Sequence, residues 1–346
     1  MKILLTGHRG YIGSVLAPLL RDRGHDVVGL DSDLFEGCDF APLEDIPSLR
    51  VDLRDVHVDH LAGFDAVMHL AALSNDPLSD LDPDLTYDIN HLASVRLARL
   101  AKQAGVPRFI FSSSCSLYGA AGDDFLDETA GFNPVTAYGE SKVLVEREVR
   151  PLADDSFSPT FLRNATAYGV SPRLRGDLVV NNLVGYAHVT GHVLIKSDGS
   201  PWRPLVHIRD ISAAFIAVLE APREMVHAES FNVGQTGENY RIREVADIVK
   251  DVVPGSTIEY AADGGPDLRC YRVDCSRIAR VLKNFQPTWT VRRGVEELYA
   301  AYQHTGLTLE DLQGARYIRL ARIRERLLEG TIDRALRVRV PVVAPA

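Results

Sequence analysis

The feature that most constrains the fold is a set of three glycines, at positions 7, 10 and 13. They follow KILLT, an apolar run of strand length, and precede SVLAPLLRDRG, whose apolar residues recur at helical spacing up to Gly24. Glycines between a strand and a helix let the backbone turn tightly and approach a diphosphate at the amino end of the helix. The next strand-like run, HDVVGLD, ends in Asp31, where a carboxylate can accept hydrogen bonds from ribose hydroxyls. The chain is therefore predicted to begin with a dinucleotide-binding unit.

The rest of the first half predicts an α/β fold. Strand-like runs in LRVDL, FDAVMHLAA, RFIFSSS and SPTFLRNATAYG alternate with helical patterns in INHLASVRLARLAKQAG and ESKVLVEREVR. Strands that alternate with helices form βαβ units with right-handed crossovers. We therefore expect a doubly wound parallel sheet of the Rossmann type.

The second half has a different organisation, because loops rich in Pro, Gly and Arg replace the regular alternation. We predict a nucleotide-binding domain at residues 1–166, with returns to it near 205–220 and 230–234. Residues 167–346 are predicted to form mainly a smaller, interleaved substrate-binding lobe with an arginine-rich, helical C-terminal tail. The sequence indicates no role for that tail.

Composition excludes several classes of protein. The net charge is −9 and no basic stripe stands out in the first three hundred residues, so nucleic acid is not an expected partner. Four cysteines in 346 residues are too few for a disulfide scaffold, and their spacing indicates no metal site. No apolar run approaches the ~20 residues that span a bilayer. We expect a cytoplasmic protein without a membrane partner.

Several motifs together resemble the extended short-chain dehydrogenase/reductase superfamily, in its branch of NAD-dependent nucleotide-sugar epimerases and dehydratases. The glycine spacing is G-x-x-G-x-x-G. Tyr138 stands four residues before Lys142, which places both on one helix face, and Ser114 precedes Tyr138 by 24 residues. The resemblance extends over nearly the whole chain. It implies NAD as cofactor and a nucleoside-diphosphate sugar as substrate.

The resemblance also implies which residues contact NAD. Asp31 favours NAD over NADP because its carboxylate repels a 2′-phosphate, whereas Arg9 argues the other way. We give Asp31 more weight because it would contact the ribose hydroxyls themselves. The implied cofactor residues are Gly7, Arg9, Gly10, Tyr11, Ile12, Gly13, Asp31, Asp52, Leu53, Leu70, Ala71, Ala72, Asn90, Ser112, Tyr138 and Lys142.

Ser114, Tyr138 and Lys142 are implied to be catalytic. Lys142 would bond the nicotinamide ribose and, as a cation, lower the pKa of Tyr138. The phenolate would then take a proton from a sugar hydroxyl while the same carbon gives up a hydride. Ser114 would hold the same oxygen.

The implied substrate contacts come from both halves of the chain. Arg203 and Arg269 suit a diphosphate, because guanidinium pairs with phosphate in a bidentate manner. Asn182 fits the register better than Asn181, and Thr166 stands where members of the family often carry Asn. The implied substrate residues are Ser114, Ser116, Tyr138, Thr166, Asn182, Arg203 and Arg269.

The activity that the resemblance favours is epimerisation, most simply at C4. Cys115 and Ser116 stand where 4,6-dehydratases carry adjacent Asp and Glu, which speaks against dehydration. We expect Cys115, His69 and His207 to have packing rather than catalytic roles. The alternatives are a 4-ketoreductase or other oxidoreductase, and a catalytically silent NAD-binding regulatory subunit. The resemblance also implies a homodimer formed by the helix after Asn90 and the helix that carries Tyr138.

Overall fold

The computed structural model describes residues 1–74, 76–79, 82–261 and 269–339. Its main sheet has seven strands in the order β11-β7-β5-β4-β1-β2-β3, and all neighbouring strands are parallel. This arrangement confirms the predicted doubly wound α/β fold. The strands are β1 (Lys2–Thr6), β2 (Asp26–Asp31), β3 (Ser48–Arg50), β4 (Ala66–His69), β5 (Arg108–Ser114), β7 (Ser158–Asn164) and β11 (Ser230–Val233).

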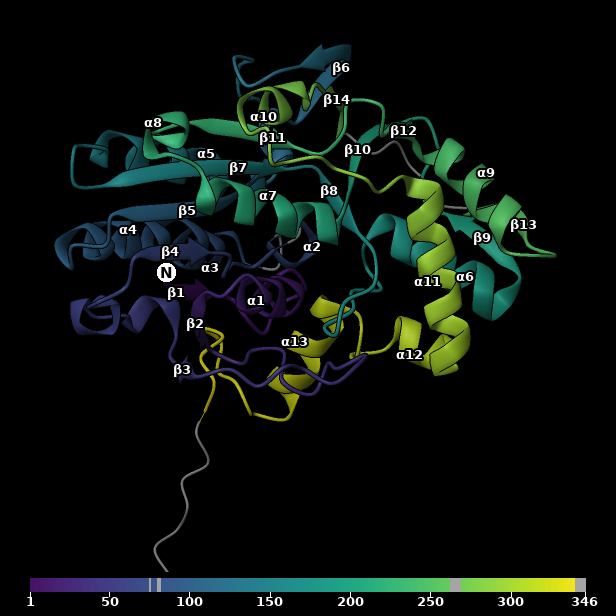
Figure 1. Ribbon diagram of the computed structural model, residues 1–346. Coiled ribbons are helices and arrows are strands. Elements are labelled where there is room, and N and C mark those ends of the chain that lie inside the picture. The colour runs from purple at the N-terminus through teal and green to yellow at the C-terminus, as the bar shows by residue number, and fades with distance from the viewer. Residues whose placement is uncertain (75, 80–81, 262–268, 340–346) are drawn as a thin grey trace, which may run out of the picture.

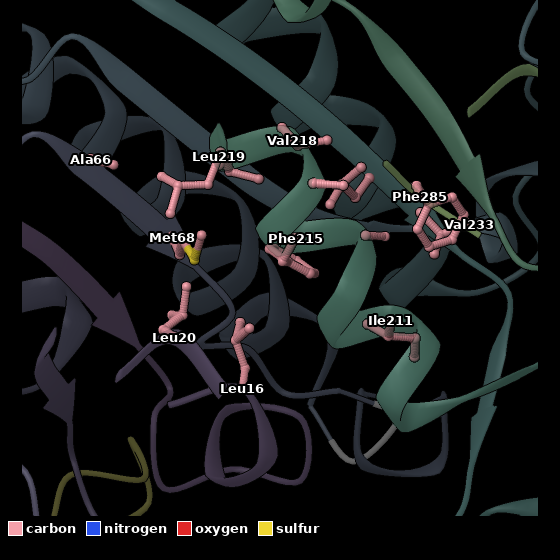
Figure 2. Close-up of a cluster of buried hydrophobic side chains, with 14 of the residues drawn as sticks. Leu16, Leu20, Ala66, Met68, Ile211, Phe215, Val218, Leu219, Val233 and Phe285 are labelled. Atoms are coloured by element: carbon pink, nitrogen blue, oxygen red, sulfur yellow. The ribbon is translucent and has the colours of Figure 1, made fainter. Parts of the chain in front are cut away.

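Helices cover both faces of this sheet, because alternate residues of each strand are apolar on opposite faces. Ile3 and Leu5 belong to a core beneath α1 (Gly13–Asp22), α7 (Ile208–Glu220) and α10 (Ser276–Val281), part of which is drawn in Figure 2. Leu4, between them, belongs to the core beneath α4 (Ala93–Gln103) and α5 (Ala137–Val149). The sheet edge that carries the carboxyl ends of the strands is thus held rigidly from both sides.

Two predicted elements differ from those observed. The third strand was predicted over LRVDL but ends at Arg50, because the side chain of Asp52 accepts a hydrogen bond from the backbone N–H of Arg54 and starts a 3₁₀ turn. The helix predicted over INHLASVRLARLAKQAG begins with a π-helical turn, Tyr87–Leu92, and becomes α-helical only in α4.

The second half builds a lobe with its own core. β8 (Thr166–Tyr168), β10 (Trp202–His207) and β12 (Asn239–Arg241) form a small sheet, and β9 (His192–Ile195) pairs with β13 (Thr257–Tyr260). Around them pack α6 (Val179–Thr190), α9 (Ile242–Val252) and α11 (Val291–Thr305). A further pair joins β6 (Ala120–Leu126) to β14 (Cys270–Val273).

The chain returns to the first half twice. Residues 230–233 form β11, at the edge of the main sheet. In the other segment only α7 packs on the main sheet, because β10 pairs with β8 and β12 instead.

The C-terminal tail folds back beneath β2 and β3, in yellow at the bottom of Figure 1. It contains α12 (Leu309–Gln313) and α13 (Arg319–Leu328). The guanidinium of Arg326 donates to the carbonyls of Asp33 and Leu34, at 2.9 Å each, in the loop that follows β2. The short helices α2 (Asp76–Ser79), α3 (Pro83–Thr86) and α8 (Arg223–Val226) complete the fold.

Candidate active site

A cavity of about 680 Å³ lies where the carboxyl ends of the central strands face the lobe. All of the residues that the sequence assigned to cofactor, substrate or catalysis line it, with the exception of Asn90. The cavity runs from the glycine turn and Asp31 past Tyr138 and Lys142 to Arg203. One continuous space therefore joins the places expected for a dinucleotide and for a second phosphorylated ligand.

The glycine turn fits the diphosphate of a dinucleotide. Gly7 has a φ of +72°, and a Cβ there would lie 2.8 Å from the backbone N of Ala71. A Cβ on Gly13 would lie 2.2 Å from the carbonyl oxygen of Gly7. Side chains are thus excluded at these two positions, and the absence of a Cβ there favours close approach of an anion to the amino end of α1.

The carboxylate of Asp31 is fixed at the end of β2. It accepts hydrogen bonds from the backbone N–H of Arg9, at 3.1 Å, and of Asp33, at 3.0 Å. The guanidinium of Arg9 lies 3.4 Å from the carboxylate of Asp33. That ion pair engages Arg9 and agrees with the greater weight given to Asp31.

Asn90 departs from its predicted role. Its side chain is buried, donates to the carbonyl of Leu73 at 2.9 Å and accepts from the N–H of Leu73 at 2.7 Å. Both ends of the amide are thus used to hold the backbone that follows β4. Asn90 positions a wall of the cavity without lining it.

The three residues predicted to be catalytic converge. Thr136 caps α5, since its hydroxyl accepts from the N–H of Gly139 at 3.2 Å. Lys142 Nζ lies 5.5 Å from the centre of the Tyr138 ring and donates to the carbonyl of Ser112 at 2.8 Å. Ser114, at the end of β5, contacts the Tyr138 hydroxyl. The geometry suits proton transfer at an oxygen held between Ser114 and Tyr138.

The pKa values correct one expectation. Burial raises the pKa of Tyr138 to about 12, although the contact with Ser114 opposes this. Burial also lowers the pKa of Lys142 to about 7. The protein's own groups therefore do not lower the pKa of Tyr138 as the sequence implied, because desolvation of the phenolate outweighs the hydrogen bond with Ser114 and the attraction to Arg175. The positive charge of oxidised nicotinamide is what would favour the phenolate here.

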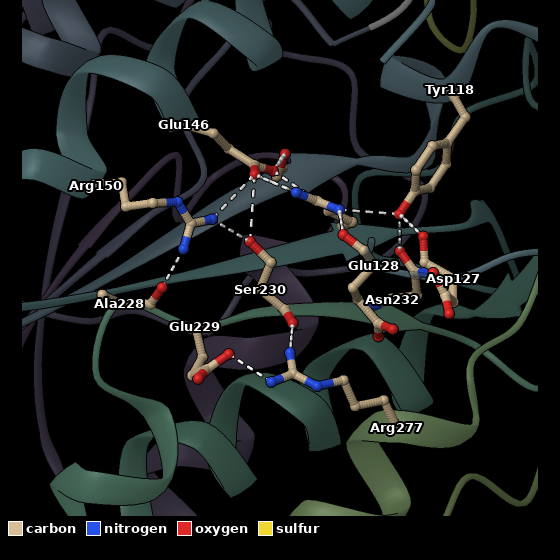
Figure 3. A network of polar contacts seen from close by, with 12 residues as sticks. Tyr118, Asp127, Glu128, Glu146, Arg150, Ala228, Glu229, Ser230, Asn232 and Arg277 are labelled. Atoms are coloured by element: carbon tan, nitrogen blue, oxygen red, sulfur yellow. Dashed lines mark hydrogen bonds and ion pairs between the residues drawn. The ribbon is translucent and has the colours of Figure 1, made fainter. Parts of the chain in front are cut away.

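A buried polar network fixes α5 below the site (Figure 3). Glu146, one turn beyond Lys142, lies 2.8 Å from the guanidinium of Arg163 on β7 and accepts from the hydroxyl of Ser113 at 2.6 Å. Ser230 on β11 also donates to Glu146, at 3.3 Å. These contacts tie the helix to three strands and hold Lys142 in position.

The far end of the cavity carries the residues expected for the substrate diphosphate. Arg203 donates to the carbonyls of Trp202, at 2.8 Å, and of Arg269. Arg269 also pairs with the carboxylate of Asp76. Asn182 lines the cavity and donates to the carbonyl of Gly176 at 2.7 Å.

The neighbouring residues Asn181 and Asn182 have different surroundings. Asn181 is buried, accepts from the N–H of Gly169 at 3.0 Å and donates to the carbonyl of Arg175 at 3.0 Å. It holds the backbone, whereas Asn182 faces the cavity. Thr166, at the position where the family often has Asn, also lines the cavity.

Sequence reasoning missed several polar side chains that line the cavity, among them Arg175 and Asn164. Arg175 pairs with Asp177 at 2.9 Å and donates to Ser74, yet its loop, SPRLRGD, reads as a solvated connection. Asn164, two residues before Thr166, lines the cavity and donates to the hydroxyl of Ser112 at 3.1 Å. No spacing signal distinguishes either residue, since each is brought to the site by the fold.

The residues expected to be structural are buried in packing contacts. Cys115 donates to the carbonyl of Arg163 and does not line the cavity, and burial raises the pKa of its thiol. His69 lies between the hydroxyls of Thr6, at 2.7 Å, and Ser94, at 2.8 Å, and burial lowers its pKa to about 3. Neither group is available for proton transfer to a substrate near neutral pH.

In the ranges that the structure describes, none of the helices combines the length and apolarity needed to cross a bilayer.

Curated relatives resemble the chain over most of its length. The UDP-glucose 4-epimerase of Bacillus subtilis is 28% identical over 329 residues, which cover 87% of this chain and 95% of the relative. The UDP-glucuronic acid decarboxylase 1 of Arabidopsis thaliana is 26% identical and covers 91% of this chain and 72% of the relative.

Solved structures also resemble the chain over most of its length. MoeE5 in complex with UDP-glucuronic acid and NAD has a TM-score of 0.77 at 28% identity, with 88% of this chain and 100% of that chain covered. The UDP-glucuronic acid 4-epimerase from Bacillus cereus, in complex with UDP-glucuronic acid and NAD, has a TM-score of 0.75 at 25% identity, with 88% and 99% covered. The family model for the NAD dependent epimerase/dehydratase family matches residues 3–234. Because that match spans more than half of the sequence, the chain belongs to the NAD dependent epimerase/dehydratase family, whose cofactor is NAD.

Proposed function

We propose that this protein is a nucleotide-sugar epimerase that inverts C4 through a transient 4-keto sugar and retains NAD between turnovers. The observation that carries the proposal is the single cavity that joins the glycine turn and Asp31 to Ser114, Tyr138 and Lys142. Relatives named as 4-epimerases, at 28% identity over most of both chains, support the choice of reaction.

The chemistry follows from the placement of the three side chains. Tyr138, as phenolate, takes the proton of the C4 hydroxyl, and Ser114 holds the same oxygen by a hydrogen bond. NAD, when bound, would supply the hydride acceptor and donor, so that hydride could leave C4 and return to the opposite face after the keto sugar has rotated. Tyr138 then gives the proton back to the oxygen, so the net change is inversion alone. Lys142 is assigned to the nicotinamide ribose.

Nucleotide recognition is proposed for the far end of the cavity. Arg203, Arg269 and Asn182 are assigned to the substrate diphosphate, and Ser116 and Thr166 to the sugar. Two solved relatives carry a UDP-sugar in complex, which supports a nucleoside diphosphate as the common group.

The test is turnover of UDP-glucose, UDP-galactose and UDP-glucuronic acid, followed by proton NMR, with no nicotinamide cofactor added. Inversion at C4 by the wild type, with a large loss in Tyr138→Phe, is the expected result. Conversion that needs added NADH would make the protein a reductase. Release of carbon dioxide or water would make it a decarboxylase or a dehydratase. Bound NAD without turnover of any sugar would support the regulatory alternative.

A cytoplasmic homodimer, with the domain division at about residue 166, completes the proposal. The two helices implied for the dimer contact, α4 and α5, direct part of their apolar surface inward, since Val95 and Val145 are buried within the subunit. Leu92, at the start of α4, remains 56% exposed. Light scattering should give a dimer for the wild type and a larger monomer fraction for Leu92→Glu. A wild type that is monomeric at micromolar concentration would contradict the proposed dimer.

A further inference from the structure

Arg319, the first residue of α13, lies far along the chain from the region that the family model matches, yet it lines the cavity. Its side chain is 3% exposed. Its Nη2 donates to the carbonyl of Arg173 at 3.2 Å, and its guanidinium lies 4.5 Å from the centre of the Phe35 ring. The other terminal nitrogen, Nη1, is buried and has no hydrogen-bond partner in the part of the chain that the structure describes.

Arg319 differs in this respect from other arginines of the cavity. Five of them pair with a carboxylate, as Arg9–Asp33, Arg54–Asp52, Arg173–Asp39, Arg175–Asp177 and Arg269–Asp76. No carboxylate of the described ranges lies within 4.0 Å of Arg319. A buried guanidinium without a counterion is costly, by several kcal/mol. An anionic ligand in the cavity would remove that cost.

The position of Arg319 indicates which anion. Phe35 belongs to the loop after β2, four residues beyond Asp31. The segment that contains Arg173 is tied to the amino end of α1, since the hydroxyl of Ser171 donates to the carbonyl of Tyr11 at 2.8 Å. The guanidinium therefore lies between the end of β2 and the start of α1. In this fold the adenosine and the diphosphate of a dinucleotide occupy that place.

The tail holds Arg319 there by contacts with the first half of the chain. Arg326 donates to the carbonyls after β2, and Arg322 donates to the carbonyl of Glu36 at 2.7 Å. Ile318, Leu320 and Leu336 line the same cavity. The tail thus forms a wall of the site, and Arg319 is the charged group in that wall.

We propose that Arg319 binds the diphosphate of NAD and that residues 318–336 close the adenosine side of the cofactor site. The inference rests on the proposed NAD-dependent function and names a cofactor contact outside the matched family region. It assigns a role to the tail, for which the sequence alone indicated none.

The experiment compares Arg319→Gln with Arg324→Gln in the full chain. Both changes remove one positive charge from α13, but Arg324 is exposed on the helix surface and does not line the cavity. Protein stripped of cofactor is titrated with NAD, ADP, adenosine and UDP, and the NAD that remains bound after gel filtration is measured. Thermal unfolding checks that each variant is folded, and Arg319→Lys keeps the charge as a second variant.

Arg319→Gln is expected to weaken the binding of NAD and of ADP by roughly 10- to 100-fold, which corresponds to the loss of a hydrogen bond to a charged group. Arg319→Gln should bind adenosine and UDP as tightly as the wild type does. Arg324→Gln should bind all four ligands with wild-type affinity. Arg319→Lys should recover part of the ADP affinity.

Four results would overturn the inference. Equal losses for adenosine and ADP would mean that Arg319 only packs the tail. A loss for UDP alone would assign Arg319 to the substrate diphosphate. Unchanged NAD affinity in Arg319→Gln, beside a wild type that binds NAD, would refute this inference and leave the proposed function standing. A wild type that binds neither NAD nor ADP would refute both.

Discussion

The helix α5 and the C-terminal tail both bring charged side chains to the same cavity, but they are held there in different ways. Glu146 fixes α5 through a buried ion pair with Arg163 and a hydrogen bond from Ser113 (Figure 3). The tail is held by arginines that donate to backbone carbonyls, as Arg326 does to Asp33 and Leu34.

The difference decides what a sequence can reveal. In α5 the chemistry requires a particular residue type at a particular spacing, so Tyr138 and Lys142 form a legible pattern. In the tail, an arginine that binds main-chain carbonyls has a partner that every residue type offers. The role of such an arginine becomes visible only when the fold has placed the carbonyls.

The largest effect is expected for Tyr138→Phe. The change keeps the ring and removes only the phenol oxygen, so turnover should fall by roughly 10² to 10⁴, the size of a general acid–base contribution. NAD affinity and the melting temperature should hardly move. Turnover measured on the substrate that the NMR assay identifies provides the check, and near-normal activity would show that another group takes the proton.

The buried ion pair that holds α5, Glu146–Arg163, should contribute most to the free energy of unfolding. Glu146→Gln leaves Arg163 buried without its anion, which is expected to reduce the free energy of unfolding by about 3 kcal/mol. Glu148→Gln on the same helix removes a carboxylate that is 42% exposed and pairs with His91, so its cost should stay below about 1 kcal/mol. Urea unfolding of the two variants makes the comparison. Equal losses would mean that burial does not distinguish the two pairs.

Arg326, which holds the tail, should affect the stability of the tail more than that of the whole molecule. Arg326→Gln loses two hydrogen bonds from a charged group, an expected cost of about 2 kcal/mol that falls on the tail. Amide hydrogen exchange should become faster in α13, while α5 keeps its protection. Uniformly faster exchange would show that the tail unfolds only together with the whole molecule.

The smallest effect concerns pH. Activity needs Tyr138 deprotonated, and its pKa is raised to about 12, mainly by burial. A nearby cation favours the phenolate and therefore moves the acidic limb of the pH–rate profile to lower pH. Lys142→Met removes a cation, and the limb should therefore move to higher pH, by about one unit or 1.4 kcal/mol. The same variant should bind NAD more weakly. If the acidic limb of the pH–rate profile does not move in Lys142→Met, Lys142 contributes to ribose binding but not to the pKa of Tyr138.

Much of the fold follows from the sequence, because strand periodicity and the glycine turn depend on local residue types. Asp31 and Tyr138 could be found for the same reason, since each has a fixed place relative to a motif. The contacts of Asn90 could not be predicted, because an amide that holds the backbone at Leu73 looks the same in sequence as one that faces a ligand. The raised pKa of Tyr138 could not be foreseen, because burial is a property of the assembled site.

The wall that the tail adds has a consequence for the order in which the molecule is made. The glycine turn leaves the ribosome early, but Arg319 is synthesised 306 residues after Gly13 (319 − 13 = 306). At roughly 5–20 residues per second, that interval is about 15 to 60 s. If Arg319 binds the diphosphate as proposed, the nascent chain lacks one wall of the cofactor site during this time. NAD that enters before Arg319 is made could then leave again, and lasting capture of the cofactor would await the synthesis of the tail.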